Sequence, residues 1–262
     1  MVGDAPAIDV MLFDVQIGAV VEQPVEHLCR LARRSGDNCG MERRVAIRDV
    51  AVTRPWTGGS GTPVMRSSDC LLEDIRACTL CAEHLPAGPR PIVQFSATST
   101  IVIIGQAPGA RVHESGTAWD DASGERLREW TGLTPDIFYD PAQVALVPMG
   151  FCYPGTGSSG DLPPRLECAR MWHDRVMAVL PPARLTLLVG SYAHQRYLVE
   201  DKKQSLTERV GKFHEYLPHY FPLPHPSWRS MGWMKRNPWF EHNVLPMLRD
   251  AIGMRIGTAP HE

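Results

Sequence analysis

No stretch of the 262-residue sequence approaches the ~20 consecutive apolar residues that a transmembrane helix needs. The sequence also lacks the basic beginning of a secretory signal peptide, because Asp4, Asp9 and Asp14 stand where such a peptide carries lysine or arginine. The seven cysteines are an odd number, which argues against a disulfide framework. These absences predict a cytoplasmic protein with no membrane partner, whose cysteines are free thiols or metal ligands.

A strong charge of either sign is missing as well. Lysine and arginine number 27 against 29 aspartates and glutamates, which gives a formal net charge of -2. Such a chain has no overall attraction to nucleic acid, so any contact with DNA must come from a local basic surface. The length is sufficient for one sizeable domain with its own core.

Residues 1–66 differ in pattern from the rest of the chain. Short apolar patches alternate there with polar and basic stretches, and the region ends in the linker-like run RPWTGGSGTP. We expect a poorly ordered N-terminal extension, either an adventitious segment upstream of Met65 or a basic arm that touches DNA through RLARR and MERR. The compact domain is expected over residues 67–254, followed by a flexible tail over residues 255–262.

From Ser68 onward, short β-rich runs alternate with segments of helical periodicity. The runs are Ile101–Ile104, Val144–Val147, Leu185–Val189 and the later stretch YFPLPHPS. Continuous apolar runs of this kind indicate strands buried on both faces, and intervening helices indicate parallel connections. We therefore predict an α/β fold, a three-layer sandwich with a central, mostly parallel four-stranded sheet flanked by helices. A last helix is expected to open at Asn237 and Pro238.

The first β-rich run ends in the loop GQAPG, residues 105–109. Ligands of open parallel sheets bind at the carboxyl ends of the strands, and glycines there let the backbone approach a planar or anionic group closely. The loop is not a dinucleotide fingerprint, because the third glycine of G-x-G-x-x-G is missing. An ordinary structural turn is the alternative interpretation.

A second candidate lies far along the chain, in PLPHPSW. His225 is held there between two prolines, which suits an imidazole that donates a hydrogen bond to developing negative charge. Because the chain has ten histidines, this position alone is a weak signal.

The third candidate is a set of four cysteines. Cys78 and Cys81 form a C-x2-C pair, and fifteen residues separate Cys152 from Cys168. Four thiolates from two such pairs can close around a [4Fe-4S] cluster or a zinc ion. The alternative is that all four are buried free cysteines.

Together these three features resemble the uracil-DNA glycosylase superfamily, and within it the iron-sulfur classes called families four and five. The first motif of that superfamily, a strand followed by G-[EQLIM]-x-P-[GAY], matches Gly105 to Gly109, and the second, H-P-S, matches His225 to Ser227. The cysteine pattern of the iron-sulfur classes falls on the four cysteines named above. The resemblance covers roughly Ser68 to Ile252.

The resemblance implies an enzyme that flips a deaminated base, uracil above all, out of DNA and hydrolyses its N-glycosidic bond to start base-excision repair. It implies a monomer whose partner is DNA containing uracil or another deaminated base. The implied cofactor is a structural [4Fe-4S] cluster on Cys78, Cys81, Cys152 and Cys168, with zinc as the less favoured occupant. The implied base-binding residues are Gly105, Gln106, Ala107, Pro108, Gly109 and Trp119, the last as a stacking ring.

The sequence departs from the family where the reaction needs an acid. The glutamate of family four is replaced by Gln106, and the aspartate of the classical enzyme by Ala107. Family five carries a proposed catalytic aspartate in a D-x-S-G stretch, which resembles DASG if the match slips by one residue after Trp119. The implied catalytic residues are therefore Asp121 and His225, with Asp120 next. Either aspartate would also be unremarkable as a helix cap.

A second departure concerns the choice of base. Uracil-specific members place an asparagine four residues before the third cluster cysteine, and this chain has Pro148 there. The resemblance therefore leaves two alternatives, a looser specificity that extends to deaminated purines such as hypoxanthine, or a specificity set by main-chain contacts.

The stretch HPSWRSMGWMKR resembles the intercalation loop of the family. It combines cations that can neutralise phosphates with apolar side chains that can wedge into the gap left by a flipped base. The residues expected to contact DNA are Ser227, Trp228, Arg229, Met231, Lys235 and Arg236. A solvated basic face is the alternative.

Two rival functions stay open at this point. One is a catalytically silent nucleic-acid-binding module of the same fold, which the missing motif carboxylate favours. The other is a zinc-stabilised nucleotide-binding protein.

Overall fold

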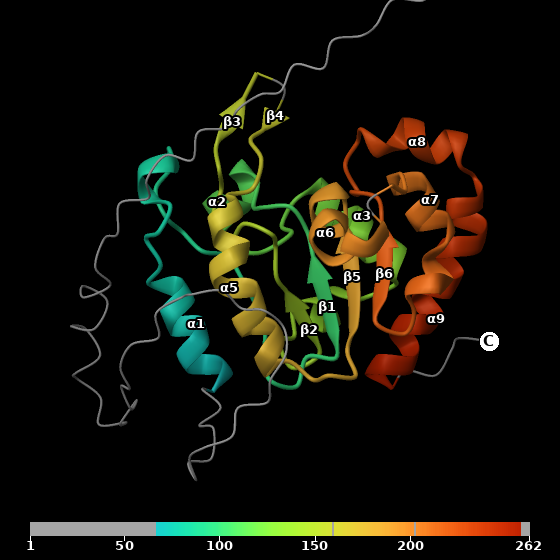
Figure 1. Ribbon diagram of the computed structural model, residues 1–262, viewed down its shortest axis with the longest axis horizontal. Coiled ribbons are helices and arrows are strands. Elements are labelled where there is room, and N and C mark those ends of the chain that lie inside the picture. The colour runs from blue at the N-terminus through green and yellow to red at the C-terminus, as the bar shows by residue number, and fades with distance from the viewer. Residues whose placement is uncertain (1–66, 159, 202, 258–262) are drawn as a thin grey trace, which may run out of the picture. The chain divides into compact units, whose positions relative to one another are not determined.

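The computed structural model describes residues 67–158, 160–201 and 203–257 (Figure 1). The predictions made above for residues 1–66 and 258–262 concern residues outside these described segments. Within them, no helix has the length and apolar character that crossing a membrane requires.

Short strands and helices alternate along the described chain. The strands are β1 (Ile101–Ile104), β2 (Val144–Leu146), β3 (Thr156–Gly157), β4 (Gly160–Asp161), β5 (Leu185–Val189) and β6 (Tyr220–Leu223). The α-helices are α1 (Ser68–Arg76), α2 (Ala110–Ser115), α3 (Ala122–Thr131), α4 (Pro135–Phe138), α5 (Leu166–Val179), α6 (Ser191–Tyr197), α7 (Leu206–Gly211), α8 (Ser230–Arg236) and α9 (Leu245–Ile256). Three short 3-10 helices are η2 (Ala82–His84), η3 (Val199–Asp201) and η4 (Phe213–Tyr216).

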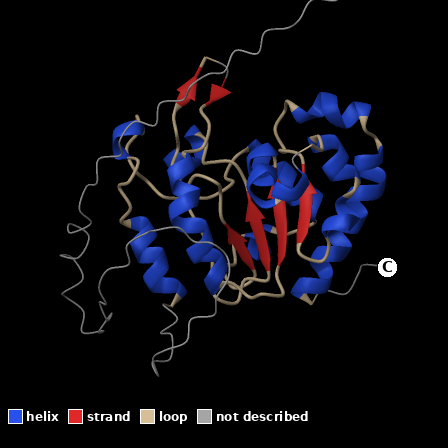
Figure 2. Cartoon of the chain, viewed as in Figure 1, coloured by secondary structure: helices blue, strands red, loops and turns tan. Residues whose placement is uncertain are grey.

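Four parallel strands form the central sheet in the order β2-β1-β5-β6 (Figure 2). Ile101 at the start of β1 is in register with Val144 of β2 and Leu185 of β5. Every residue of β1, β2 and β5 is buried, as expected for strands that are covered on both faces. The predicted α/β fold with a parallel four-stranded sheet and flanking helices is confirmed.

The side chains of β1 alternate between two hydrophobic cores, one on each face of the sheet. Ile101 and Ile103 pack in a core with residues of α3 and α9. Val102 and Ile104 pack in a second core with residues of α1, α5 and α6. Since strand side chains point alternately to opposite faces, the uninterrupted IVII run supplies both cores.

The strand order creates a crevice at the carboxyl ends of β1 and β5. The chain leaves β1 toward β2 on one side, and it leaves β5 toward β6 on the other. The loops after these two neighbouring strands therefore diverge, which is the position where open α/β sheets bind ligands.

A small antiparallel hairpin, β3–β4, was not predicted. Thr156 pairs with Asp161 and Gly157 with Gly160, in the segment between β2 and α5. The sequence analysis assigned no strand to this segment, because two-residue strands with one glycine each show no alternating pattern. Figure 1 shows the hairpin on the side toward which the sheet strands point.

The last helix also differs from its expected form. A π-helix, η5 (Phe240–Val244), precedes α9 in place of a continuous α-helix that opens at Asn237 and Pro238. Pro246 has no N–H to donate to the carbonyl of His242, and the wider π-turn lies where that bond is missing. The helix ends at Ile256, past residue 254, where the sequence analysis placed the end of the domain.

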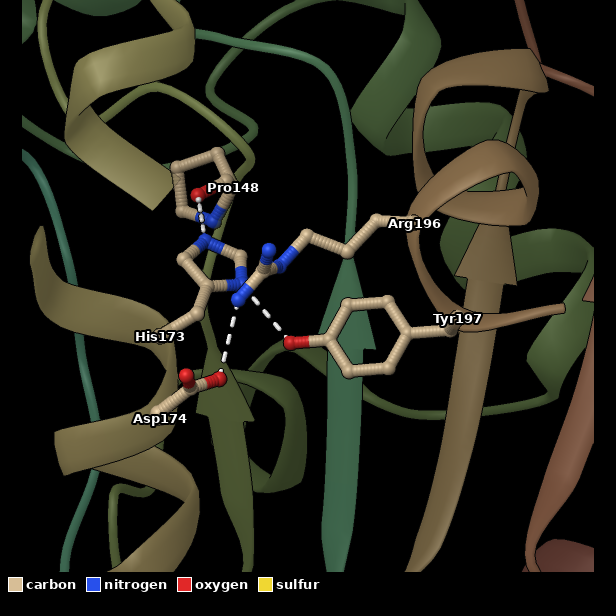
Figure 3. A network of polar contacts seen from close by, with 5 residues as sticks. All are labelled: Pro148, His173, Asp174, Arg196 and Tyr197. Atoms are coloured by element: carbon tan, nitrogen blue, oxygen red, sulfur yellow. Dashed lines mark hydrogen bonds and ion pairs between the residues drawn. The ribbon is translucent and has the colours of Figure 1, made fainter. Parts of the chain in front are cut away.

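Behind the sheet, His173 connects α5 to two other segments (Figure 3). Its Nε2 lies 2.9 Å from the carbonyl oxygen of Pro148, and its Nδ1 lies 2.7 Å from the hydroxyl of Tyr197. A carbonyl only accepts, so Nε2 carries the proton and Nδ1 accepts from the phenol. Burial lowers the pKa of His173 to about 4, which keeps this imidazole neutral.

A second buried histidine, His194 of α6, has the same character. Its Nε2 lies 2.9 Å from the carbonyl oxygen of Leu188, and the side chain is fully buried. Burial lowers its pKa to about 4 as well. Both buried imidazoles are thus neutral parts of the core.

Because these two histidines are neutral in the folded protein, we expect its free energy of unfolding to depend on pH. Their folded pKa of about 4 lies below the ordinary value of 6.5, so the unfolded chain binds protons that the folded chain does not. The free energy of unfolding should therefore fall as the pH drops from about 6.5 to about 4, by ~2 kcal/mol per histidine between about pH 7.5 and pH 5. Urea unfolding at several pH values measures this slope. His194→Gln should reduce the slope by about half, whereas the exposed His242→Gln should leave it unchanged; equal slopes in both variants would contradict the assignment.

Candidate active site

A pocket of about 400 Å³ opens at the carboxyl ends of the sheet strands. Its walls come from the loops that follow β1, β2 and β6, from the start of α3 and from the β3–β4 hairpin. All six residues expected to bind a base line it, namely Gly105, Gln106, Ala107, Pro108, Gly109 and Trp119. Asp121 and His225 line it too, whereas Asp120 does not.

The loop after β1 is fixed by two main-chain hydrogen bonds to the loop after β2. The N–H of Met149 donates to the Gly105 carbonyl at 2.9 Å, and the N–H of Gly150 donates to the Gln106 carbonyl at 3.0 Å. Because a trans peptide points its N–H opposite to its carbonyl, the N–H groups of Gln106 and Ala107 both point away from β2. Consecutive N–H groups directed to one side form a site for a negatively charged oxygen.

Trp119 forms a rigid wall of the pocket. Its φ of 59° is the only positive value at a non-glycine residue within the described segments. A Cβ on Gly105 would lie 2.5 Å from the indole Cζ2, and a Cβ on Gly124 would lie 1.8 Å from the Trp119 carbonyl oxygen. The indole therefore packs against Gly105 and the Trp119 backbone against Gly124, at two positions where a Cβ would clash.

His225 and Asp121 lie close together on another wall. Burial lowers the pKa of His225, and the negative charge of Asp121 opposes that shift only in part. The imidazole is therefore neutral near neutral pH and can donate one N–H to a ligand. The imidazole lies beside Trp119, with 5.9 Å between the two ring centroids.

Asp121 also has the structural role that its position suggests. Its Oδ1 accepts from the N–H of Gly124 at 2.8 Å, which caps the first turn of α3. Asp120 does not line the pocket. Burial raises the pKa of the Tyr139 phenol, Arg128 opposes this shift, and the charges of Asp120 and Asp121 both add to it. Of the two aspartates considered from the sequence, Asp121 is the one that lines the pocket.

Pro148 lies at the position where the resemblance described above leads us to expect an asparagine that reads the base. It lines the pocket, but a proline has no N–H, and its carbonyl already accepts from His173 (Figure 3). This wall can contact a base but offers no side-chain amide to read its edge.

The residues expected to contact DNA fall into two groups. Ser227, Trp228 and Arg229 lie at the pocket, and the Trp228 side chain is 74% exposed with the Arg229 guanidinium carbon 5.3 Å from its ring centroid. The others, on α8, are exposed but do not line the pocket: Met231, Lys235 and Arg236.

The sequence analysis missed the wall that the β3–β4 hairpin contributes. Gly160, Asp161 and Leu162 line the pocket from this hairpin. A Cβ on Gly160 would lie 3.0 Å from a guanidinium nitrogen of Arg229, so the hairpin contacts the loop that follows His225. The Ser-Gly pair before Asp161 was the available turn signal.

The four predicted metal ligands come together in a second, smaller pocket. Cys78, Cys81, Cys152 and Cys168 all line it, and the Cys168 sulfur accepts from the N–H of Phe151 at 3.3 Å. Burial raises the pKa of Cys152 to about 11 and that of Cys168 to about 12, and the neighbouring cysteines act in the same direction. Among the side chains that the structure describes, no three histidine, cysteine or carboxylate groups form a set that could hold a metal ion.

A protein-family model named for the uracil DNA glycosylase superfamily matches residues 92–249 of the chain. The chain belongs to the uracil DNA glycosylase superfamily. The match spans the four-stranded sheet, the GQAPG loop and His225. Membership in this superfamily indicates DNA as the substrate and N-glycosylase activity on uracil-like bases. Because the match begins at residue 92, it contains Cys152 and Cys168 but neither Cys78 nor Cys81.

Gly124→Ala tests the packing of Trp119. The new Cβ would lie 1.8 Å from the Trp119 carbonyl oxygen, so the tryptophan loop or the start of α3 must move. We expect a loss of ~1–3 kcal/mol in the free energy of unfolding and a slower cleavage of uracil-containing DNA. Gly211→Ala is the matched control, because its Cβ would meet nothing closer than Trp239 at 3.7 Å. Equal stability of the two variants would contradict the rigid wall.

Proposed function

We propose that the protein is a uracil-DNA glycosylase-like hydrolase. It flips a deaminated base, uracil above all, into the 400 Å³ pocket and hydrolyses the N-glycosidic bond, which starts base-excision repair. The observation that carries this proposal is that the N–H groups of Gln106 and Ala107 share a pocket with the neutral imidazole of His225.

These donors suit the departure of a base as an anion. When the bond between the sugar and uracil breaks, its electron pair leaves with the base, and negative charge spreads onto the carbonyl oxygen on the ring carbon next to the bond. The two main-chain N–H groups and His225 can donate to that oxygen, and a fixed donor acts more strongly on this charge than mobile water. The sugar becomes oxocarbenium-like and is captured by water, a step that a nearby carboxylate such as Asp121 favours.

The pocket supports recognition by shape and main-chain contacts. Pro148 supplies no amide, so no side chain at that position selects uracil from other bases. Uracil and hypoxanthine share a carbonyl oxygen beside a ring N–H, the pattern that deamination creates. We therefore include hypoxanthine as a substrate beside uracil, both stacked on Trp119.

The surface around His225 suits bound DNA. Trp228 is an exposed apolar side chain at the pocket and can enter the gap that a flipped base leaves. Arg229, Lys235 and Arg236 provide the local positive charge that a chain of net charge -2 needs to contact phosphates.

We further propose that the cysteine pocket holds a structural [4Fe-4S] cluster, as in the iron-sulfur families that the chain resembles. A zinc ion with four thiolates requires sulfur atoms about 3.8 Å apart, and the described side chains form no set that could hold a metal ion. A four-iron cluster is larger and binds one cysteine on each iron. Its four ligands can therefore be thiols that line one pocket but lie too far apart to bind a single ion. The raised pKa values of Cys152 and Cys168 keep these two thiols neutral unless a cation binds.

One observation favours a second function, a silent DNA-binding module. The loop after β1 carries Gln106 and Ala107 in place of the carboxylates of related enzymes. Such a module would bind DNA without forming abasic sites.

Single-turnover cleavage of oligonucleotides that carry uracil, hypoxanthine or xanthine tests the proposed function. The protein should form abasic sites, and His225→Ala should slow cleavage by ~10² to 10³ while DNA affinity changes little. His242→Ala, at an exposed histidine, should retain the rate. The absence of abasic sites with all three bases would support the silent module.

The cluster is tested by metal content rather than by activity. Anaerobically purified protein should be brown, absorb near ~400 nm and contain about four irons per chain. Cys152→Ser should remove most of the iron, whereas Cys70→Ser should not, since Cys70 lies outside the cysteine pocket. One zinc per chain without iron would contradict the cluster.

A further inference from the structure

The main-chain donors of the pocket depend on a short segment after β2, residues 148–151. The N–H groups of Met149 and Gly150 in this segment donate to the carbonyls of Gly105 and Gln106 at 2.9 and 3.0 Å. These two bonds orient the peptide groups of the loop after β1. The donors of that loop can be no better fixed than the segment that holds them, so the residues that fix this segment bear on the proposed reaction.

His173 of α5 contacts the 148–151 segment at both of its ends (Figure 3). Its Nε2 lies 2.9 Å from the Pro148 carbonyl oxygen. Its ring lies nearly parallel to that of Phe151, with 5.8 Å between the ring centroids and 16° between the ring planes. The two residues whose N–H groups hold the loop after β1 lie between these contacts. His173 is fully buried and does not line the pocket, so it can influence a bound base only through other residues.

A neutral imidazole suits this place because it donates on one side of a rigid ring and accepts on the other. The Tyr197 hydroxyl lies 2.7 Å from Nδ1 of His173, and burial raises the pKa of this phenol, which therefore keeps a proton to donate. With Nδ1 as the acceptor, the ring proton stays on Nε2, which lies against the Pro148 carbonyl. Tyr197 thus selects the tautomer that holds the 148–151 segment.

A similar bond at the other edge of the sheet provides a matched comparison. The hydroxyl of the buried Ser99 donates to the Pro141 carbonyl at 2.7 Å, between the segments that precede β1 and β2. Both bonds join a buried side chain to the carbonyl of a proline close to β2. Only the bond from His173 lies at the carboxyl edge, where these strands lead into the pocket. Comparing the two bonds therefore separates support of the fold from support of the pocket.

We propose that His173 is a positioning residue for the glycosylase reaction, and that it acts through the 148–151 segment on the N–H groups of Gln106 and Ala107. The assignment rests on the function proposed above. By holding the segment, His173 keeps these two donors directed to one side, so they need not reorganise when negative charge forms on the departing base. Without the Nε2 donor, the buried Pro148 carbonyl loses its partner, and the segment that carries the two main-chain bonds can shift.

Single-turnover cleavage of uracil-containing DNA by His173→Leu is the first test. Leucine fills the buried space but donates no hydrogen bond, so we expect the rate to fall by ~10 to 10². Affinity for a duplex carrying 2′-fluoro-2′-deoxyuridine, which resists cleavage, should stay nearly unchanged, because every residue that lines the pocket is retained. His173→Gln, whose amide can still donate to the Pro148 carbonyl, should recover part of the rate. Ser99→Ala is the matched control and should retain all of it.

Hydrogen exchange read by mass spectrometry tests the route and needs no activity. In anaerobically purified His173→Leu, the N–H groups of Met149 and Gly150 should exchange at least ~10-fold faster than in the unsubstituted protein, because their bonds then open more often. The N–H of Val147, which donates to a carbonyl of β1 within the sheet, should keep its exchange rate. Tyr197→Phe keeps the buried ring but no longer fixes the imidazole tautomer. It should change the cleavage and exchange rates in the same directions by smaller factors, and it serves as the test if His173→Leu does not fold.

Failure of this assignment is distinguishable from failure of the proposed function. An unchanged cleavage rate in the His173 and Tyr197 variants, or an equal loss in Ser99→Ala, would overturn the positioning role and leave the glycosylase function intact. So would a rate loss matched by an equal loss of affinity for the uncleaved duplex, or slower cleavage with unchanged exchange at the two N–H groups. No cleavage by the unsubstituted protein would overturn the proposed function, and the positioning role with it. The exchange rates would then still show whether His173 holds the 148–151 segment.

Discussion

Two main-chain hydrogen bonds between the loops after β1 and β2 determine the rest of the site. They hold the carbonyls of Gly105 and Gln106, and so turn two consecutive N–H groups toward the side where His225 lies. The loop after β2 is itself held from behind, because His173 donates to the Pro148 carbonyl. The orientation of the pocket donors therefore depends on a neutral buried imidazole that touches no ligand.

Much of the fold could be predicted from the sequence because its signals are local. The run Ile101–Ile104 is short, β-branched and apolar without interruption, which is typical of a strand covered on both faces. The GQAPG loop and His225 were predicted separately, and the parallel topology alone brings them to one edge of the sheet. The four cysteines likewise meet in one pocket, as their paired spacing indicated.

The remaining features depend on contacts between distant segments, which no local pattern encodes. The hairpin that carries Asp161 is held by Gly109 and Arg229, one before it in the chain and one far after it. The positive φ of Trp119 is unusual for a bulky side chain and follows from packing against glycines on two other elements. The role of Asp121 is ambiguous in sequence because one carboxylate caps a helix and also faces the pocket.

The confinement of Trp119 has a consequence for the thermodynamics of base capture. A tryptophan that stacks on a ligand from a mobile loop must give up rotational freedom at the moment of binding. Here the indole packs on Gly105, and the Trp119 backbone packs on Gly124, before any base arrives. That entropy is lost when the chain folds, so the flipped base meets a surface that is already ordered.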